Sequence, residues 1–153
     1  MRRIPVRVMF DTNVVLDVLL DRKAFVNDSA LLLDRVERGA ITGLLCATTI
    51  TTLACLAGKA AGKRQATQQI RQLLTLFEVA PVTRAVLDGA LASKAPDFEN
   101  AVLAEAALQA GAQAIITRNL RDFAHSPVEP TRLRSGGRCT LTIKPEAGLA
   151  TCS

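Results

Sequence analysis

Short apolar segments alternate with segments of helical periodicity from residue 6 onward in this chain. The apolar segments, at 6–10, 41–48, 77–83 and 113–118, have the nearly continuous apolar character of strands that are buried on both faces. Parallel strands need long connections, which are usually helices. The alternation therefore predicts an α/β fold with a mainly parallel sheet.

The helical segments carry recognisable start and stop signals. The clearest helix is predicted over 96–111, where Pro96 suits the first helical position, acidic residues fill the first turn and Gly111 ends the pattern. Residues 49–77 predict two helices, with a break near Gly58–Gly62. The remaining segments predict helices at 13–21, 28–39 and 83–94, a turn or half-turn of helix at 119–123 and an edge strand at 126–130.

One domain is expected over residues 1–131, since 49% of the chain is apolar and can form a substantial core. The segment 132–153 is basic and then rich in Gly and Thr, which leaves three alternatives for it: an extra strand, a partner-binding segment or disorder. No apolar window is long enough to span a membrane, and Asp11 interrupts the first apolar run too early for a signal peptide. We therefore expect a cytoplasmic protein with no membrane partner.

Composition narrows the classes of partner and site. The net charge of +5 favours an anionic partner such as RNA or DNA, although an ordinary soluble basic surface has the same charge. Trp and Tyr are absent, so binding of single strands by aromatic stacking is disfavoured. The cysteines form no C-x-x-C pair and have no His near them, which argues against a zinc site.

Polar residues follow two of the predicted strands at the point where each strand ends. Asp11 comes directly after 6–10, and Asn119 and Asp122 follow 113–118. Functional groups gather beyond the carboxyl ends of parallel strands, so we expect these residues to share one crevice. Carboxylates that share a crevice repel each other unless a cation is present, and their oxygens suit Mg²⁺ or Mn²⁺. Such an ion can activate water and neutralise a scissile phosphate.

Further polar residues are candidates for the same site. Asp97 and Glu99 lie in the first turn of the helix predicted over 96–111, and Asn100 shares a helix face with Asp97. The other candidates are Asn13 and Asn119, which would orient ligands or bound waters, and Arg118 and Arg121, which would hold phosphate oxygens.

Each candidate also has a purely structural interpretation. Asp11 is placed to cap the helix after it, and Asp122 to cap a turn. Asp97 and Glu99 are favourable charges at a helix N-terminus in any case. The structural alternatives for the remaining polar residues are a solvated surface for Arg118 and Arg121, a polar helix face or cap for Asp17, Asp21 and Asp28, a surface position for His125, and a solvated helix face for Lys59, Lys63 and Arg64.

The segments FDTNVVLDVLLDR (10–22) and DFENAVLAEAALQAGAQAIITRNLRDF (97–123) resemble the PIN domain family, in the bacterial branch related to VapC-type toxin ribonucleases. DTNV and ITRNLRDF occur in the family's order, and together they are more specific than either is alone. The resemblance covers roughly residues 6–130. It implies a three-layer α/β/α sandwich, hydrolysis of RNA phosphodiesters that depends on Mg²⁺ or Mn²⁺, an antitoxin protein as partner, and a homodimer.

The resemblance also implies which residues form the site. The family pattern has up to four acids, of which Asp11 matches the first and Asp122 the last. Thr52 stands at the second position and Asn100 at the third, so neutral side chains replace two carboxylates. Some close relatives also lack the second acid, and Asn100 is therefore the more important departure.

Two hypotheses follow from this departure. In the first, the chain is an active ribonuclease, in which Asp97 or Glu99 supplies the missing charge and Asn100 ligates the metal ion through its carbonyl oxygen. In the second, catalysis is weakened and the fold serves as an RNA-binding or protein-binding module, with Arg118 and Arg121 near the old site. An Asp97 side chain turned away from Asp11 would favour the second hypothesis.

A third class, the aspartyl-nucleophile phosphatases, also has a strand that ends like DTN. Those enzymes need a second Asp two residues after the first, where this chain has Asn13. They also need a Lys before their final acids, and none stands near TRNLRDF. This class is therefore disfavoured.

Overall fold

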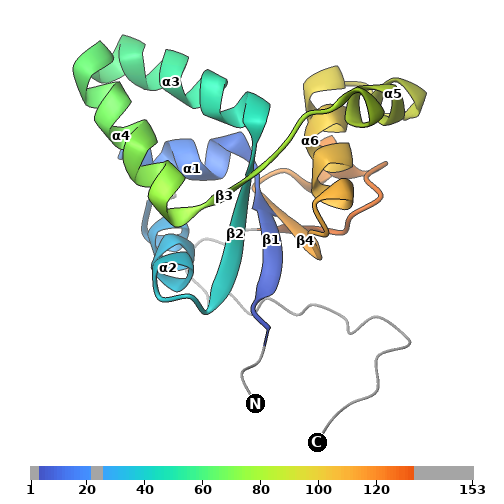
Figure 1. Cartoon of the computed structure of the whole chain (residues 1–153), viewed down its shortest axis with the longest axis horizontal. Helices are drawn as coiled ribbons and strands as arrows, with labels where there is room; N and C mark the ends of the chain where they lie inside the picture. Colours follow the sequence, from blue (N-terminus) through green and yellow to red (C-terminus); the bar gives the residue numbers. More distant parts are fainter. Residues whose placement is uncertain (1–3, 22–25, 133–153) are drawn as a thin grey trace, which may run out of the picture.

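A computed structural model describes residues 4–21 and 26–132, and in this part of the chain a five-stranded sheet lies between two layers of helices (Figure 1). All neighbouring strands are parallel, in the order β3-β2-β1-β4-β5. Met9 of the central strand lies beside Leu44 and Ile115. The strands are β1 (Val6–Phe10), β2 (Ile41–Cys46), β3 (Glu78–Ala80), β4 (Ala114–Thr117) and β5 (Pro130–Arg132). The predicted mainly parallel sheet is confirmed.

Helices cover both faces of the sheet, which confirms the three-layer α/β/α sandwich. One layer contains α1 (Thr12–Leu19), α2 (Val26–Glu37), α3 (Ala47–Ala61) and α4 (Lys63–Leu76). The other contains α5 (Arg84–Ala92) and α6 (Phe98–Gln109), as Figure 1 shows. None of the described helices is long and apolar enough to cross a membrane.

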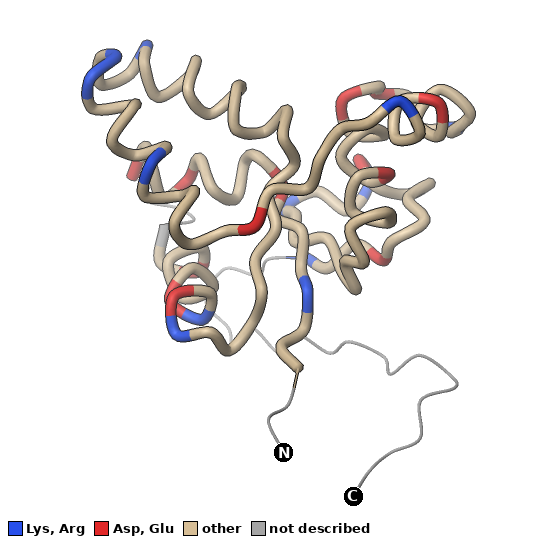
Figure 2. Tube along the Cα trace, viewed as in Figure 1, with Lys and Arg blue, Asp and Glu red and all other residues tan. Residues whose placement is uncertain are grey.

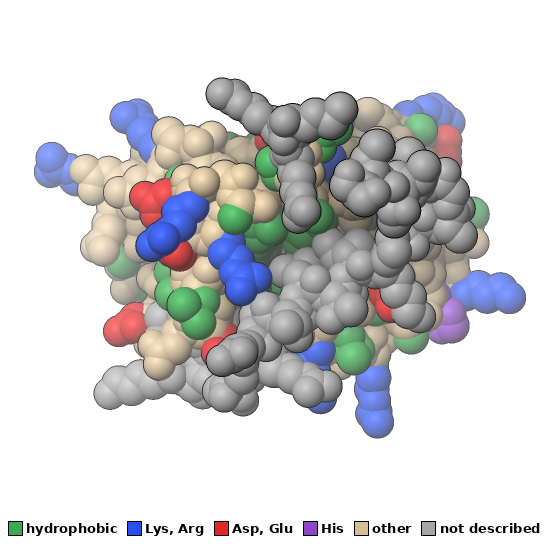
Figure 3. Space-filling view, turned by 90° about the horizontal axis from the view of Figure 1, so that it is seen from below, with side chains coloured by type: hydrophobic (Ala, Val, Ile, Leu, Met, Phe, Trp, Pro, Cys, Tyr) green, Lys and Arg blue, Asp and Glu red, His purple; other side chains and the backbone are tan. Residues whose placement is uncertain are grey.

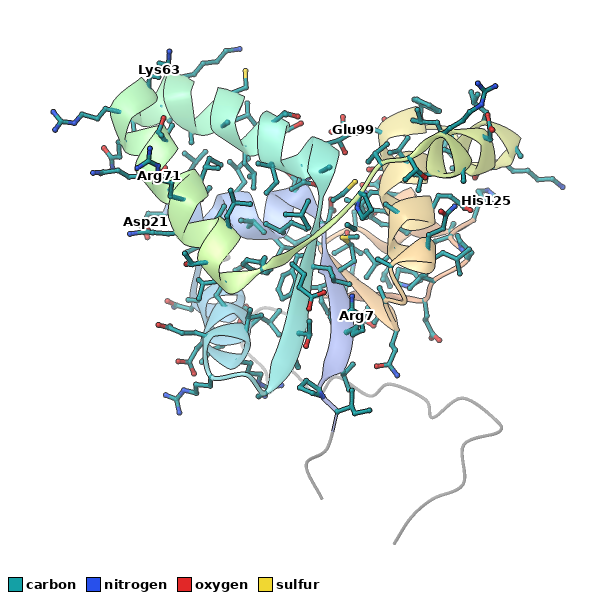
Figure 4. All side chains as sticks on the ribbon, in the orientation of Figure 1. Arg7, Asp21, Lys63, Arg71, Glu99 and His125 are labelled. Atoms are coloured by element: carbon teal, nitrogen blue, oxygen red, sulfur yellow. The ribbon has the colours of Figure 1, made fainter. Side chains whose placement is uncertain are left out.

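The predicted break between α3 and α4 falls at Gly62. Its φ of 88° and ψ of 157° belong to a backbone region that is essentially restricted to glycine. The α3–α4 hairpin that results carries Lys59, Lys63 and Arg64 near its tip, and all three are exposed. Figure 2 shows basic residues at this end of the hairpin, and Figure 4 shows Lys63 away from the sheet. The solvated position expected for these three basic residues is confirmed.

Alternate residues of the central strand face opposite helical layers, as the pleat of a strand requires. Val8 and Phe10 belong to the apolar cluster that includes residues of α1, α2 and α4. Met9 belongs to the cluster on the α5–α6 side, to which α6 contributes many alanines. Small side chains let α6 lie close to the sheet, so the N-terminus of α6 comes near the carboxyl ends of the strands.

The last strand is the element whose predicted position is wrong. β5 occupies residues 130–132 rather than 126–130. The Ser126 hydroxyl accepts a hydrogen bond from the Val128 N–H (3.1 Å) and donates one to the Val128 carbonyl (2.6 Å), which holds this segment in a turn. The alternatives for the tail 132–153 lie outside the described residues from 133 onward, so the boundary at 131 stays a prediction.

Candidate active site

Asp11 lies at the carboxyl edge of the sheet, between the ends of β1 and β4. Its backbone N–H donates to the Ile116 carbonyl (2.9 Å), which continues the pairing of the two strands. Its carboxylate accepts a hydrogen bond from the Thr117 hydroxyl, with Oγ1 2.9 Å from Oδ2. Both side chains are buried, and no side-chain hydrogen bond from Asp11 caps α1. Asp11 does stand at the N-cap position of α1, as the structural interpretation expects, but its carboxylate accepts from Thr117 and makes no capping hydrogen bond.

Thr117 also links Asp11 to the second candidate acid. Thr117 Oγ1 accepts a hydrogen bond from the Asn119 N–H (3.1 Å), and Asn119 Nδ2 donates to Asp122 Oδ1 (3.1 Å). Asn119 is the N-cap of a short 3₁₀ helix, η1 (Leu120–Phe123), because its Oδ1 accepts from the Arg121 N–H (3.1 Å). A continuous set of hydrogen bonds therefore fixes Asp11 and Asp122 relative to each other.

The pKa of Asp11 is raised, chiefly because burial removes its carboxylate from water. The hydrogen bond from Thr117 and the backbone N–H of Thr12 act in the opposite direction and favour the charged form. The charge of Asp122 raises the pKa further, and the charge of Arg118 lowers it. The two acids thus repel each other across the site, as expected of carboxylates that share a cation.

A cavity of about 210 Å³ opens beside Asp11, lined also by Asn13, Thr52, Glu99 and Asn100. Thr52 Oγ1 donates to Glu99 Oε1 at 3.4 Å, so α3 and α6 approach each other across this cavity. Glu99 lies at the end of α6 that faces α3 (Figure 4). The cavity therefore brings together five of the predicted site residues from four different segments.

Asp97 lies elsewhere. Its carboxylate caps α6 by accepting a hydrogen bond from the Asn100 N–H (2.9 Å), and its side chain is exposed. It does not line the cavity beside Asp11. This cap also explains why α6 begins at Phe98, two residues later than the predicted start at Pro96.

Arg118 forms an ion pair with Asp17, a residue whose predicted position is wrong. Asp17, predicted on a polar helix face or as a cap, is 0% exposed, and its Oδ2 lies 3.2 Å from Arg118 Nε. The Arg118 side chain is 22% exposed, so it is not a freely solvated residue. Arg121 is exposed. Asp17 partly neutralises Arg118, which leaves more of the negative charge of Asp11 available to a cation.

A second cavity of about 310 Å³ adjoins the site. We call it the α5–α6 pocket, and its lining includes Gly89, Lys94, Asn100, Glu105, Asp122 and His125. Asn100 lines both cavities, so they are neighbours, with Asp11 in the wall of one and Asp122 in the wall of the other. His125 is exposed, as predicted.

Sequence reasoning placed Thr52 of α3 in the site but missed Thr117 and Thr49. Thr12 Oγ1 and Thr49 Oγ1 lie 3.0 Å apart, and Thr49 is buried in the wall of the cavity beside Asp11. The signal for Thr117 was its place at the end of a strand that pairs with β1. For Thr49, the run of hydroxyl residues directly after the β2 segment was the available signal.

The residues present fit one kind of metal site and not another. Among the described residues, no group of three or more His, Cys, Asp or Glu side chains is placed to hold a metal ion. Mg²⁺, however, is commonly held by one or two carboxylates and keeps several waters. The repelling pair of Asp11 and Asp122, with the Asn100 amide nearby, suits such a partly hydrated ion and does not suit a cage made of protein ligands.

Comparisons with known proteins agree with the fold. Residues 7–121 match a family model described as a PIN domain. No curated protein matches the chain significantly. VapBC2 from Rickettsia felis, solved with a DNA fragment from its promoter, is 14% identical with a TM-score of 0.64, and the match covers 84% of this chain and 100% of that one.

Two further solved structures are similar. A toxin–antitoxin complex from Klebsiella pneumoniae is 20% identical with a TM-score of 0.64, covering 84% of this chain and 98% of that one. VapC20 from Mycobacterium tuberculosis, described as a toxin that cleaves the sarcin–ricin loop, is 15% identical with a TM-score of 0.57 and covers 71% and 86%. At these identities the similarity shows a shared fold.

Proposed function

The chain belongs to the PIN domain family, and from this premise we propose that it is a Mg²⁺- or Mn²⁺-dependent endoribonuclease of the VapC toxin type. The observation that carries the proposal is the pair of Asp11 and Asp122, fixed by Thr117 and Asn119 at the carboxyl edge of the sheet. Two fixed carboxylates that repel each other favour a divalent cation.

The roles of the residues follow from their positions. Asp11 and Asp122 would hold the ion, with the Asn100 carbonyl oxygen as a further ligand. When bound, the ion supplies a hydroxide at neutral pH and neutralises charge on the phosphodiester. Thr117 holds the Asp11 carboxylate in one orientation, and Arg121 is exposed beside the site to bind a phosphate oxygen.

Glu99 is the better candidate for the missing acidic charge. Asp97 is occupied in capping α6 and is absent from the lining of the cavity beside Asp11, whereas Glu99 lines that cavity. Thr52, at the position where the family pattern has an acid, donates to Glu99. In this proposal, the Glu99 carboxylate of α6 takes the role of the second family acid.

A second candidate function is an RNA-binding or protein-binding module with weakened catalysis. Two observations favour it. The described residues contain no group of three or more His, Cys, Asp or Glu side chains placed to hold a metal ion, and the Asp97 carboxylate caps α6 by accepting from the Asn100 N–H. The protein would then bind RNA with the same fold but would not cleave it efficiently.

Cleavage of a mixed single-stranded RNA pool distinguishes the two functions. Highly purified wild type is assayed with Mn²⁺, Mg²⁺ or EDTA, beside Asp11→Asn and Asn100→Asp. Cleavage by the wild type that requires metal and disappears in Asp11→Asn supports the nuclease. An inactive wild type, with activity that appears in Asn100→Asp, supports the binding module.

We also propose an antitoxin-type protein as partner, because two solved relatives are described as VapBC or toxin–antitoxin complexes. An apolar cavity of about 240 Å³ between α1, α2 and α4 is a suitable place for it, lined by Val15, Leu33, Leu73 and Leu76. Leu76→Glu should prevent capture of the co-expressed partner while leaving RNA cleavage intact. The homodimer and the cytoplasmic location stay predictions, to be checked by light scattering and cell fractionation.

A further inference from the structure

The α5–α6 pocket has the character of a small-ligand site. Its volume of about 310 Å³ lies at the lower end of the usual range for such sites, about 300–1,000 Å³. Its apolar wall includes Ala101, Ala104 and Phe123. Among these apolar side chains stand a few polar groups, which is the arrangement that fixes the orientation of a bound ligand.

Glu105 is a half-buried carboxylate that lines this pocket. A Cβ on Gly89 would lie 2.5 Å from Cδ and Oε1 of Glu105, so the glycine in α5 lets this side chain keep its position, and a larger residue there would make it move. Glycine is unfavourable inside a helix, and close approach by a neighbour is a physical reason to have it there. Within the described residues, no hydrogen bond or ion pair to the Glu105 carboxylate forms. Its oxygens remain available as acceptors at the pocket.

Two nitrogen-bearing side chains stand at the mouth of the pocket, whose lining also includes Asp122. Lys94 and His125 both line it and are exposed. Figure 4 shows His125 on the α5–α6 side of the molecule, on the far side of the sheet from the α3–α4 hairpin. A ligand with an anionic end and a base with hydrogen-bond donors would therefore satisfy both the rim and Glu105.

We propose, on the basis of the ribonuclease function proposed above, that the α5–α6 pocket binds an unpaired guanine nucleotide of the RNA beside the cleaved bond. Glu105 accepts hydrogen bonds from the guanine N1–H and N2 amino group, and Lys94 and His125 bind the phosphate. Guanine alone presents two adjacent donors on its pairing edge. Adenine and cytosine present one amino group, and uracil presents an N–H between two carbonyls that repel a carboxylate.

Binding of single nucleotides in EDTA tests this inference without any cleavage. Calorimetry would compare guanosine, adenosine, cytidine and uridine 5′-monophosphates on the full-length wild type. We expect guanosine monophosphate to bind at least about 5-fold tighter than the others, as a bidentate contact to one base provides. Equal affinities, or no binding of any nucleotide at millimolar concentration, would overturn the inference, and neither result depends on a variant that folds.

Variants assign the preference to its residues. Glu105→Gln should abolish the preference for guanosine, whereas Glu129→Gln, a matched change at an exposed glutamate outside the pocket, should keep it. Lys94→Ala should weaken all four nucleotides by a similar factor. A preference that survives Glu105→Gln, in a variant with wild-type circular dichroism and melting temperature, removes Glu105 from the proposal.

The two proposals fail in different ways. Guanosine preference without metal-dependent RNA cleavage would leave the pocket in place and refute the nuclease. Metal-dependent cleavage by a protein that binds the four monophosphates equally would leave the nuclease in place and refute the guanine pocket.

Discussion

Burial and the neighbouring Asp122 raise the pKa of Asp11 above its usual value, so the ionised carboxylate destabilises the metal-free fold at neutral pH. The folded protein binds this proton more tightly than the unfolded chain does. Stability should therefore increase as the pH falls through the raised pKa of the folded state towards the ordinary value of 3.8. Such destabilisation by an ionised carboxylate is expected where a site is built to bind a cation.

We accordingly predict that Asp11→Asn raises the melting temperature in EDTA at pH 7, and that this advantage shrinks at acid pH. Mg²⁺ should raise the melting temperature of the wild type but not that of the variant. Thermal melts between pH 4 and pH 8, with and without Mg²⁺, measure both effects. A lower melting temperature for the variant at pH 7 would mean that the hydrogen bond between Thr117 and the wild-type Asp11 carboxylate outweighs the repulsion between Asp11 and Asp122.

Asp17 is a residue whose importance is visible only in the folded chain. We predict that Asp17→Asn lowers the free energy of unfolding by about 3 kcal/mol, because it removes the buried carboxylate that pairs with Arg118. The matched control is Asp34→Asn, which breaks the exposed pair with Arg38 and should cost less than about 1 kcal/mol. Urea denaturation measures the difference, and equal losses would show that the Asp17–Arg118 pair contributes little.

At the scale of elements, the N-terminus of α6 carries two acids with different expected roles: Asp97 caps the helix, and Glu99 lines the cavity beside Asp11. Serine is also a good N-cap, so Asp97→Ser should keep both the stability and the Mn²⁺ affinity of the wild type, whereas Asp97→Ala should lose about 1 kcal/mol of stability. Glu99→Gln should lower the Mn²⁺ affinity with little loss of stability. Calorimetric Mn²⁺ titration with urea melts tests the pair of residues, and a lower affinity in Asp97→Ser would restore Asp97 to the site.

The order and type of the elements could be predicted from the sequence, because apolar runs and helical spacing are local properties. Asp11, Asn119 and Asp122 were correctly placed at one edge, because strand ends of a parallel sheet coincide. Positions that depend on tertiary contacts could not be predicted. The sequence around Asp17 predicts a solvent-exposed position on α1. In the folded chain Asp17 is buried, because Arg118, directly after β4, lies beside it and pairs with its charge. The segment that begins at Ser126 forms a turn instead of the predicted strand, because the Ser126 hydroxyl makes two hydrogen bonds with the Val128 backbone.

For the whole molecule, the described residues carry 12 Lys and Arg against 13 Asp and Glu, so the positive excess behind the net charge of +5 belongs to residues outside the described part of the chain. Seen from below, at the amino-terminal ends of the strands, the described basic side chains stand among acidic and apolar ones (Figure 3). The α3–α4 tip carries its basic residues far from the site (Figure 2). Net charge alone therefore does not mark the proposed RNA-binding face, and individual arginines near the site must be tested.

We predict that Arg121→Ala weakens the binding of single-stranded RNA and reduces the slope of log affinity against log salt concentration by about 0.7, the contribution of one phosphate contact. Arg38→Ala, directly after α2 and paired with Asp34, should leave the slope unchanged. Arg118→Ala should change it less than Arg121→Ala, since Asp17 already neutralises part of its charge. Fluorescence anisotropy in EDTA at several salt concentrations measures the slopes, and identical slopes for all variants would remove Arg121 from the RNA-binding face.

The hydrogen bond between Asp11 and Thr117 joins residues 106 positions apart, and it has a consequence for the order of events during translation. β1 leaves the ribosome first, although it is the centre of the sheet and pairs with β4 on one side. At ordinary elongation speeds, roughly 5–20 s pass before Thr117 has been made. A nascent chain therefore contains its first acid long before it contains an assembled site, which cannot form until β4 and η1 have emerged.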